Sequence, residues 1–172
     1  MNSIWIKQVS RFLLLFAFQV LVLKQVHLVV GSFNYISLII IPLWCMLLPV
    51  QTPRWLLVLL GFTFGILVDW FYDSPGVHAS AGTFLGFARP FIMSYIEPKG
   101  GYNRIPIPSK FHLGINWFVT YCSVSLLTYL LFYFSMEIFT PAYIGTIFLK
   151  TIFSFVLSIL LMLLYMFIFD PE

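Results

Sequence analysis

Residues 55–96 read WLLVLLGFTFGILVDWFYDSPGVHASAGTFLGFARPFIMSYI, two long apolar runs on either side of one short polar segment. The separating residues 73–76 are Asp-Ser-Pro-Gly, which are residue types that favour a tight turn. Each run approaches the roughly 20 apolar residues with which a helix crosses the hydrocarbon core of a membrane. The stretch therefore predicts a hairpin of two membrane-spanning helices, Trp55–Tyr72 and Val77–Ile96.

The composition of the whole chain points to the same environment. Its 172 residues are 61% hydrophobic, 20% aromatic and only 9% charged, and the mean hydropathy is +1.00. Soluble domains carry about 25% charged residues, so these charges are too few to cover the water-facing surface of a 20.0 kDa globule. The composition excludes a soluble enzyme, a nucleic-acid-binding protein and a disordered chain. It predicts an integral membrane protein.

Further apolar runs extend the hairpin to a predicted all-α bundle of six transmembrane helices, which forms one polytopic domain over residues 1–172. The expected helices cover about residues 9–30, 35–50, 55–72, 77–96, 111–139 and 143–169. The one sizeable polar stretch, residues 97–110, reads EPKGGYNRIPIPSK. Such a segment cannot lie in hydrocarbon, because its backbone polar groups would lack hydrogen-bond partners. It is predicted to be a cytoplasmic loop.

The distribution of basic residues predicts the orientation of the bundle. With six helices, both termini and the connections at 51–54 and 97–110 lie on one side of the membrane. Seven basic residues belong to that side or lean toward it: Lys7, Arg11, Arg54, Arg89, Lys99, Arg104 and Lys110. Only Lys24 and Lys150 belong to the other side. Because cytoplasmic loops are enriched in Lys and Arg, both termini are expected in the cytoplasm.

Two ionisable residues inside predicted helices are candidate functional groups, because burying an unpaired charge in a membrane is costly. Asp69 is either an interfacial acid, hydrated or paired with Lys24 or Lys150, or a polar anchor for a partner or ligand on the outer face. Arg89 either contacts a lipid phosphate or a helix-end carbonyl, or forms with Pro90 a docking point for a partner helix. The sequence leaves both alternatives open.

Glycines four residues apart occur in both helices of the predicted hairpin. Gly61 and Gly65 lie on the first helix, and Gly82 and Gly86 lie on the second. Such pairs form flat stripes that let two helix backbones approach closely. They are expected to pack the two helices against each other, and the alternative is the docking of a partner helix.

No enzyme, metal or cofactor signature stands out in the sequence. Asp69, Asp73 and His78 can meet on one outer patch, but no second His or Cys is spaced for a metal site. Cys45 and Cys122 fall inside apolar runs without metal-binding or redox spacing, so they are expected to be buried thiols. The sequence therefore predicts no catalytic residues, no metal and no cofactor.

The hairpin and the polar loop that follows it resemble the family of the rod shape-determining protein MreD. That family carries a glycine-spaced apolar helix that ends in Asp, then a Ser/Pro/Gly turn, then a His-small-small opening of the next helix. The matching positions here are Gly61, Gly65, Asp69, Ser74, Pro75, Gly76, His78 and Ala79, followed by Arg89-Pro90 and EPKGGY at residues 97–102. The specific motif covers about residues 54–102.

The resemblance implies a non-enzymatic component of the bacterial cell-elongation machinery in the inner membrane. Its expected partners are membrane lipids, MreC, the actin-like MreB, and the membrane polymerase and transpeptidase that build the lateral peptidoglycan wall. The implied fold is similar to the six-helix substrate-binding subunits of energy-coupling-factor vitamin transporters. The residues expected at partner contacts are Asp69, Asp73, Pro75, Gly76, His78, Arg89, Pro90, Lys99, Gly100, Gly101, Tyr102 and Arg104.

The fold of that family also suggests an alternative function, a solute-binding membrane subunit of a vitamin-type transporter. Such subunits often dock through an AxxxA stripe on their first helix. The first helix here, FLLLFAFQVLVL at residues 12–23, contains only Ala17 and lacks this stripe. The sequence therefore favours the scaffold over the transporter subunit.

Overall fold

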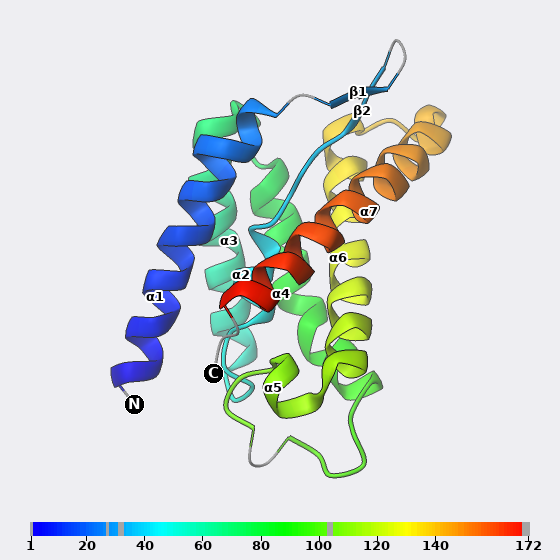
Figure 1. Cartoon of the computed structure of the whole chain (residues 1–172). Helices are drawn as coiled ribbons and strands as arrows, with labels where there is room; N and C mark the ends of the chain where they lie inside the picture. Colours follow the sequence, from blue (N-terminus) through cyan, green and yellow to red (C-terminus); the bar gives the residue numbers. More distant parts are fainter. Residues whose placement is uncertain (1, 27, 31–32, 103–104, 170–172) are drawn as a thin grey trace.

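The computed structural model describes residues 2–26, 28–30, 33–102 and 105–169, which form a bundle of helices with one small β-hairpin (Figure 1). The long helices are α1 (Asn2–Ala17), α3 (Arg54–Tyr72), α4 (Val77–Tyr95), α6 (Ile115–Ile138) and α7 (Ile144–Phe169). The shorter elements are η1 (Phe18–Val22), η2 (Leu23–Gln25), β1 (Leu28–Val30), β2 (Phe33–Ile36), α2 (Pro42–Met46), α5 (Lys110–Leu113) and η3 (Pro141–Tyr143).

Four helical stretches of the described chain are long and apolar enough to cross a membrane. They are Ile6–Gln25, Arg54–Tyr72, Ile115–Ile138 and Ile144–Phe169. Their outward faces carry large exposed apolar side chains, which in water would be an unfavourable surface and in lipid a favourable one. The protein is therefore a membrane protein. Helix α4 has the same 19-residue length as α3 but is less apolar, and it packs against α3 and α6.

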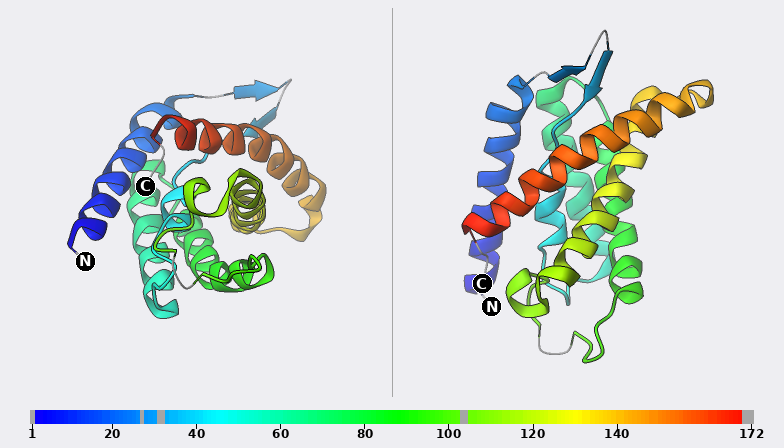
Figure 2. Two further views of the ribbon diagram at one scale, coloured as in Figure 1. Left: turned by 60° about the horizontal axis from the view of Figure 1, so that its bottom comes forward. Right: turned by 45° about the vertical axis from the view of Figure 1, so that its right-hand side comes forward.

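The predicted helix over residues 35–50 is wrong, and the described residues show four candidate spanning helices where six were predicted. Strand β2 pairs with β1 in an antiparallel hairpin and ends at Ile36. The chain then continues without helix as far as Ile41, and within residues 35–50 only Pro42–Met46 is α-helical. Residues 37–48, here called the central segment, pass through the middle of the bundle (Figures 1 and 2). Residues 39–48 are all buried. Non-helical backbone is tolerated at membrane depth where surrounding protein supplies its hydrogen bonds.

Two other helices differ from their predicted bounds. The first helix was expected to reach residue 30, but its last turns are a π-helix and a 3₁₀-helix that end at Gln25. The helix expected over residues 111–139 is divided at Gly114, whose φ of +81° breaks the helical backbone. The predicted bounds of the helices that became α3, α4 and α7 agree with the structure to within a residue.

The four spaced glycines bring α3 and α4 into backbone contact, as the sequence predicted. A Cβ atom added to Gly61 would lie 2.2 Å from the carbonyl oxygen of Gly82, and one added to Gly65 would lie 2.3 Å from Cα of Ala79. A Cβ on Gly86 would lie 2.4 Å from the carbonyl oxygen of Leu57. Since no side chain fits between these backbones, the glycines pack α3 against α4 within the chain and are not available to a partner helix.

Candidate functional site

The turn between α3 and α4 is organised by the carboxylate of Asp69. Its Oδ1 accepts hydrogen bonds from the Ser74 hydroxyl at 2.9 Å and from the backbone N–H of His78 at 2.9 Å. Its Oδ2 accepts from the N–H groups of Gly76 at 3.1 Å and of Ala79 at 2.9 Å. These N–H groups belong to the N-cap residue Gly76 and to the first turn of α4, where a negative charge also complements the helix dipole. Asp69 therefore ties the end of α3 to the start of α4.

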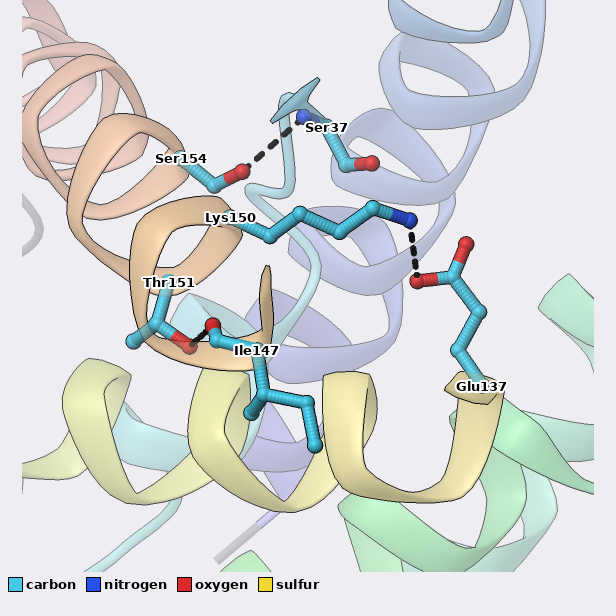
Figure 3. Close-up of polar contacts among 6 residues, drawn as sticks. All are labelled: Ser37, Glu137, Ile147, Lys150, Thr151 and Ser154. Atoms are coloured by element: carbon cyan, nitrogen blue, oxygen red, sulfur yellow. Dashed lines mark hydrogen bonds and ion pairs between the residues drawn. The ribbon is translucent and has the colours of Figure 1, made fainter. Parts of the chain in front are cut away.

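This arrangement corrects the ion pairs that the sequence suggested for Asp69. Lys150 Nζ lies 3.0 Å from Glu137 Oε2 and joins α7 to α6 (Figure 3). Lys24 Nζ instead donates to the carbonyl oxygen of Phe71. Asp69 is only 5% exposed. It is paired with neither Lys24 nor Lys150, and both of its oxygens accept hydrogen bonds from the chain itself.

Three of the residues expected to contact a partner lie on the surface of the same turn. Asp73, Pro75 and Gly76 are exposed, and together with Asp69 and the exposed Trp70 they line an open hollow of about 500 Å³. Asp73 and Gly76 adopt left-handed conformations, with φ of +53° and +89°. Asp is among the few non-glycine residues that tolerate this region, so the sequence Asp-Ser-Pro-Gly suits the reversal of the chain.

His78 does not join an outer patch with Asp69 and Asp73, because its side chain is completely buried. Its Nδ1 lies 2.8 Å from the Tyr129 hydroxyl on α6. The ring centroids of Tyr72 and Tyr133 lie 5.1 and 4.7 Å from that of the imidazole. Among the described residues, no group of three His, Cys, Asp or Glu side chains is placed to hold a metal ion. The histidine packs the hairpin against α6.

Arg89 reaches from α4 into the bundle and binds the end of α2. The guanidinium donates from Nη2 to the carbonyl oxygens of Leu48 and, at 3.4 Å, of Met46. Its Nε donates to the Tyr121 hydroxyl at 3.0 Å, and Tyr121 in turn donates to the Met46 carbonyl at 3.0 Å. Of the contacts considered for Arg89 from the sequence, the one with carbonyl groups at the end of a helix is therefore confirmed. The side chain is 1% exposed, so it is not a surface for a lipid phosphate or a partner helix.

Further backbone groups of the central segment are bound by uncharged polar residues that the sequence did not single out. Gln19 on the first helix accepts at Oε1 from the N–H of Ile40 at 2.8 Å and donates from Nε2 to the Leu38 carbonyl at 3.0 Å. Other partners come from α1 and α7, as Figure 3 shows for one pair: Ser154 Oγ with Ser37 N, Ser158 Oγ with Ile39 N, and Gln8 Nε2 with the Leu47 carbonyl. The sequence does contain a signal for these contacts. Gln19 interrupts the apolar run 12–23, and Ser154 and Ser158 lie four residues apart on one face of α7.

The segment 97–102 packs against the end of α4. The Tyr102 hydroxyl donates to the Met93 carbonyl at 2.8 Å, and burial together with the nearby Glu97 carboxylate raises the pKa of Tyr102 to about 12. Gly101 has a φ of +65° in this turn, and Lys99 and Gly100 are exposed. Pro90 and Tyr102 line a common pocket of about 350 Å³. Arg104, the last of the expected contact residues, lies outside the described residues.

The described polar interior is thus organised around the protein's own backbone. Asp69, Arg89 and Gln19 each bind several main-chain groups, and both cysteines are free and buried, as the sequence predicted. Comparison of the chain with protein-family models, curated proteins and solved structures finds no match. The structure defines a helical membrane protein in which a glycine-packed hairpin and a buried central segment form the core.

The role of Asp69 leads to a prediction about stability. Asp69→Leu removes the acceptor of the buried N–H groups of His78 and Ala79, and each unsatisfied buried group costs about 1–3 kcal/mol. We expect a loss of about 2–4 kcal/mol, seen as a lower melting temperature of the purified protein in detergent. Asp73→Asn is the matched control, because Asn also tolerates the left-handed conformation. Equal melting temperatures for Asp69→Leu and the wild type would contradict this role.

Proposed function

We propose that this chain is a non-enzymatic scaffold of the bacterial cell-elongation machinery, of the MreD type, which helps determine rod shape by organising lateral peptidoglycan synthesis. One observation carries the proposal. The residues that carry the resemblance to MreD are the ones that build the α3–α4 hairpin: Gly61 and Gly65 in its contact, and Asp69 and His78 at its turn. The residues on which the resemblance rests therefore form one structural unit, the α3–α4 hairpin.

The proposed topology has both termini in the cytoplasm of a cell with the protein in its inner membrane. In the structure, the start of α1, the end of α7 and the segment 97–102 lie toward the same end of the molecule, and the α3–α4 turn lies at the other end (Figure 1). The chain would then pass the bilayer six times, with the central segment as its second, largely non-helical passage. The related bundle would be that of the energy-coupling-factor substrate-binding subunits.

In this proposal the protein works by contact. The apolar outer faces of α1 and α7 meet lipid and the membrane helices of partners. The exposed Lys99 lies at the level of anionic head groups, where each basic residue contributes about 1 kcal/mol. The outer hollow beside Asp73 faces the periplasm, where MreC has its soluble domain. MreB and the wall-synthesis polymerase and transpeptidase would join through the same assembly.

The filled interior favours the scaffold over the vitamin-transporter alternative. A solute-binding subunit needs polar groups that converge on a space inside the bundle. Here the central segment occupies the middle of the bundle, and Gln19, Arg89 and Tyr121 are hydrogen-bonded to its backbone.

Affinity purification from native membranes tests this proposal. The tagged protein would be extracted in mild detergent and the co-purifying proteins identified by mass spectrometry, with a tagged unrelated multi-pass protein as the control. We expect MreC and enzymes of wall synthesis to be enriched over the control. Recovery of a transporter's membrane coupling subunit with its ATPases would overturn the scaffold and assign the transporter function.

A further inference from the structure

A groove about 480 Å³ in volume runs between α1 and α7. Helix α7 lies close to α1 near its own C-terminal end and diverges from it toward the other end (Figure 2). Ile40 of the central segment lines it together with Leu15, Ala17 and Phe18 on the first helix, and the lining residues on α7 are apolar except for the hydroxyl of Tyr165. The groove therefore suits an apolar chain.

The guanidinium of Arg11 lies beside this groove, next to Tyr165 on its wall. Arg11 precedes Leu15 by four residues and Phe18 by seven, so it extends the same face of α1 toward the N-terminus. Arg11 is only 8% exposed, and its Nη1 has no hydrogen-bond partner among the described residues. The guanidinium forms a hydrogen bond with the hydroxyl of Tyr165, which belongs to the wall on α7. The apolar groove thus lies beside a cation whose Nη1 has no hydrogen-bond partner among the described residues.

We propose that the groove between α1 and α7 binds one anionic phospholipid, with an acyl chain along the apolar walls and the phosphate at Arg11. A cation inside a membrane is costly unless it is paired, and a guanidinium donates strong charge-assisted hydrogen bonds to phosphate oxygens. An apolar groove with a cation beside it matches the chemistry of such a lipid.

The depth of Arg11 agrees with this occupant. The residue lies five positions inside the span Ile6–Gln25, which is about 7–8 Å at the helical rise of 1.5 Å per residue. A long arginine side chain extends toward the interface over such a distance. The head group of the adjacent leaflet is therefore within reach.

Two other occupants fit the groove less well. Helices that pack in membranes approach through small residues, but the wall on the first helix offers only Ala17 among bulky side chains. A second copy of the chain would bring its own Arg11 to a symmetric contact, and two like charges would then face each other. The lipid proposal does not depend on the role in wall synthesis, and its test does not use wall-synthesis partners.

Native mass spectrometry of the delipidated protein in detergent, titrated with phosphatidylglycerol or phosphatidylcholine, tests the charge. We expect one phosphatidylglycerol to bind at least about tenfold more tightly than phosphatidylcholine, and Arg11→Gln to remove this preference. Arg54→Gln is the matched control, because Arg54 is an exposed arginine at the start of α3. Equal binding of phosphatidylglycerol to the wild type and Arg11→Gln would overturn the proposal.

A second pair of variants tests whether the lipid occupies the groove, and it leaves Arg11 unchanged. Ala17→Trp places a large side chain in the groove, whereas Leu13→Trp places it on a part of α1 that is 59% exposed and outside the groove. Both positions face outward, so both variants are expected to fold. We expect Ala17→Trp to abolish the bound phosphatidylglycerol and Leu13→Trp to retain it. If Ala17→Trp instead dissociates a dimer, or releases a partner, with lipid binding unchanged, the groove is a protein interface and the proposal fails.

Discussion

Gly65→Ala is expected to prevent the stable folding of this protein, although it adds only one methyl group. The new Cβ would lie 2.3 Å from Cα and 2.5 Å from the backbone nitrogen of Ala79. Both atoms belong to a helix backbone, so neither can rotate away, and the whole of α4 has to shift. Overpacking of a core usually costs about 1–3 kcal/mol and sometimes more. Because the contact is between two backbones, we expect a loss of about 3 kcal/mol or more.

The measurement is the yield of monodisperse protein from membranes, together with its melting temperature in detergent. Gly82→Ala should behave in the same way, because its Cβ would lie 2.3 Å from the Gly61 carbonyl oxygen. Gly145→Ala is the matched control, since a Cβ at this glycine meets no atom within 4 Å. Normal yield and unchanged melting of Gly65→Ala would mean that α3 and α4 do not pack as described.

Arg89→Met is expected to produce a comparable loss, for an electrostatic reason. The substitution keeps a long side chain but removes the donors to the Leu48 and Met46 carbonyl oxygens and to the Tyr121 hydroxyl. The Leu48 carbonyl then loses its described donor inside a buried segment, and an unsatisfied buried group costs about 1–3 kcal/mol. With the loss of the Tyr121 contact as well, we expect a decrease of about 3 kcal/mol in the free energy of unfolding.

Thermal unfolding in detergent and proteolysis of the folded protein would measure this effect. Tyr121→Phe should cost less, because Arg89 still donates to the Met46 carbonyl at 3.4 Å. Arg54→Met is the matched control at an exposed arginine. If Arg89→Met melts like the wild type, the central segment does not depend on the guanidinium, and the arginine is free for another role.

The α3–α4 hairpin is the part of the fold that was accessible from the sequence. Its helices are marked by local signals, which are apolar runs of spanning length and the turn Asp-Ser-Pro-Gly at residues 73–76. The partner of the glycine stripes was also predictable, because a tight turn leaves two adjacent helices close together. The structure confirms both the helix bounds and the contacts of Gly61 and Gly65.

For Asp69 and Arg89 the sequence predicted that each charge needs a partner, but not which groups provide it. The sequence marked them because a charge inside an apolar run needs a partner, but it does not say where that partner lies. For Asp69 the partners are up to ten residues away, at the start of the next helix. For Arg89 they are carbonyl oxygens more than 40 residues away in a different element.

Composition and local spacing are sufficient to predict that this is a membrane protein and that its middle is a glycine-packed hairpin. The conformation of residues 35–50, in contrast, depends on contacts with distant parts of the chain. Their apolar character is compatible with a spanning helix, and the choice depends on whether neighbours satisfy the backbone. Here Gln19, Arg89, Tyr121 and the serines of α7 do so. Those donors and acceptors come together only when the whole bundle is folded.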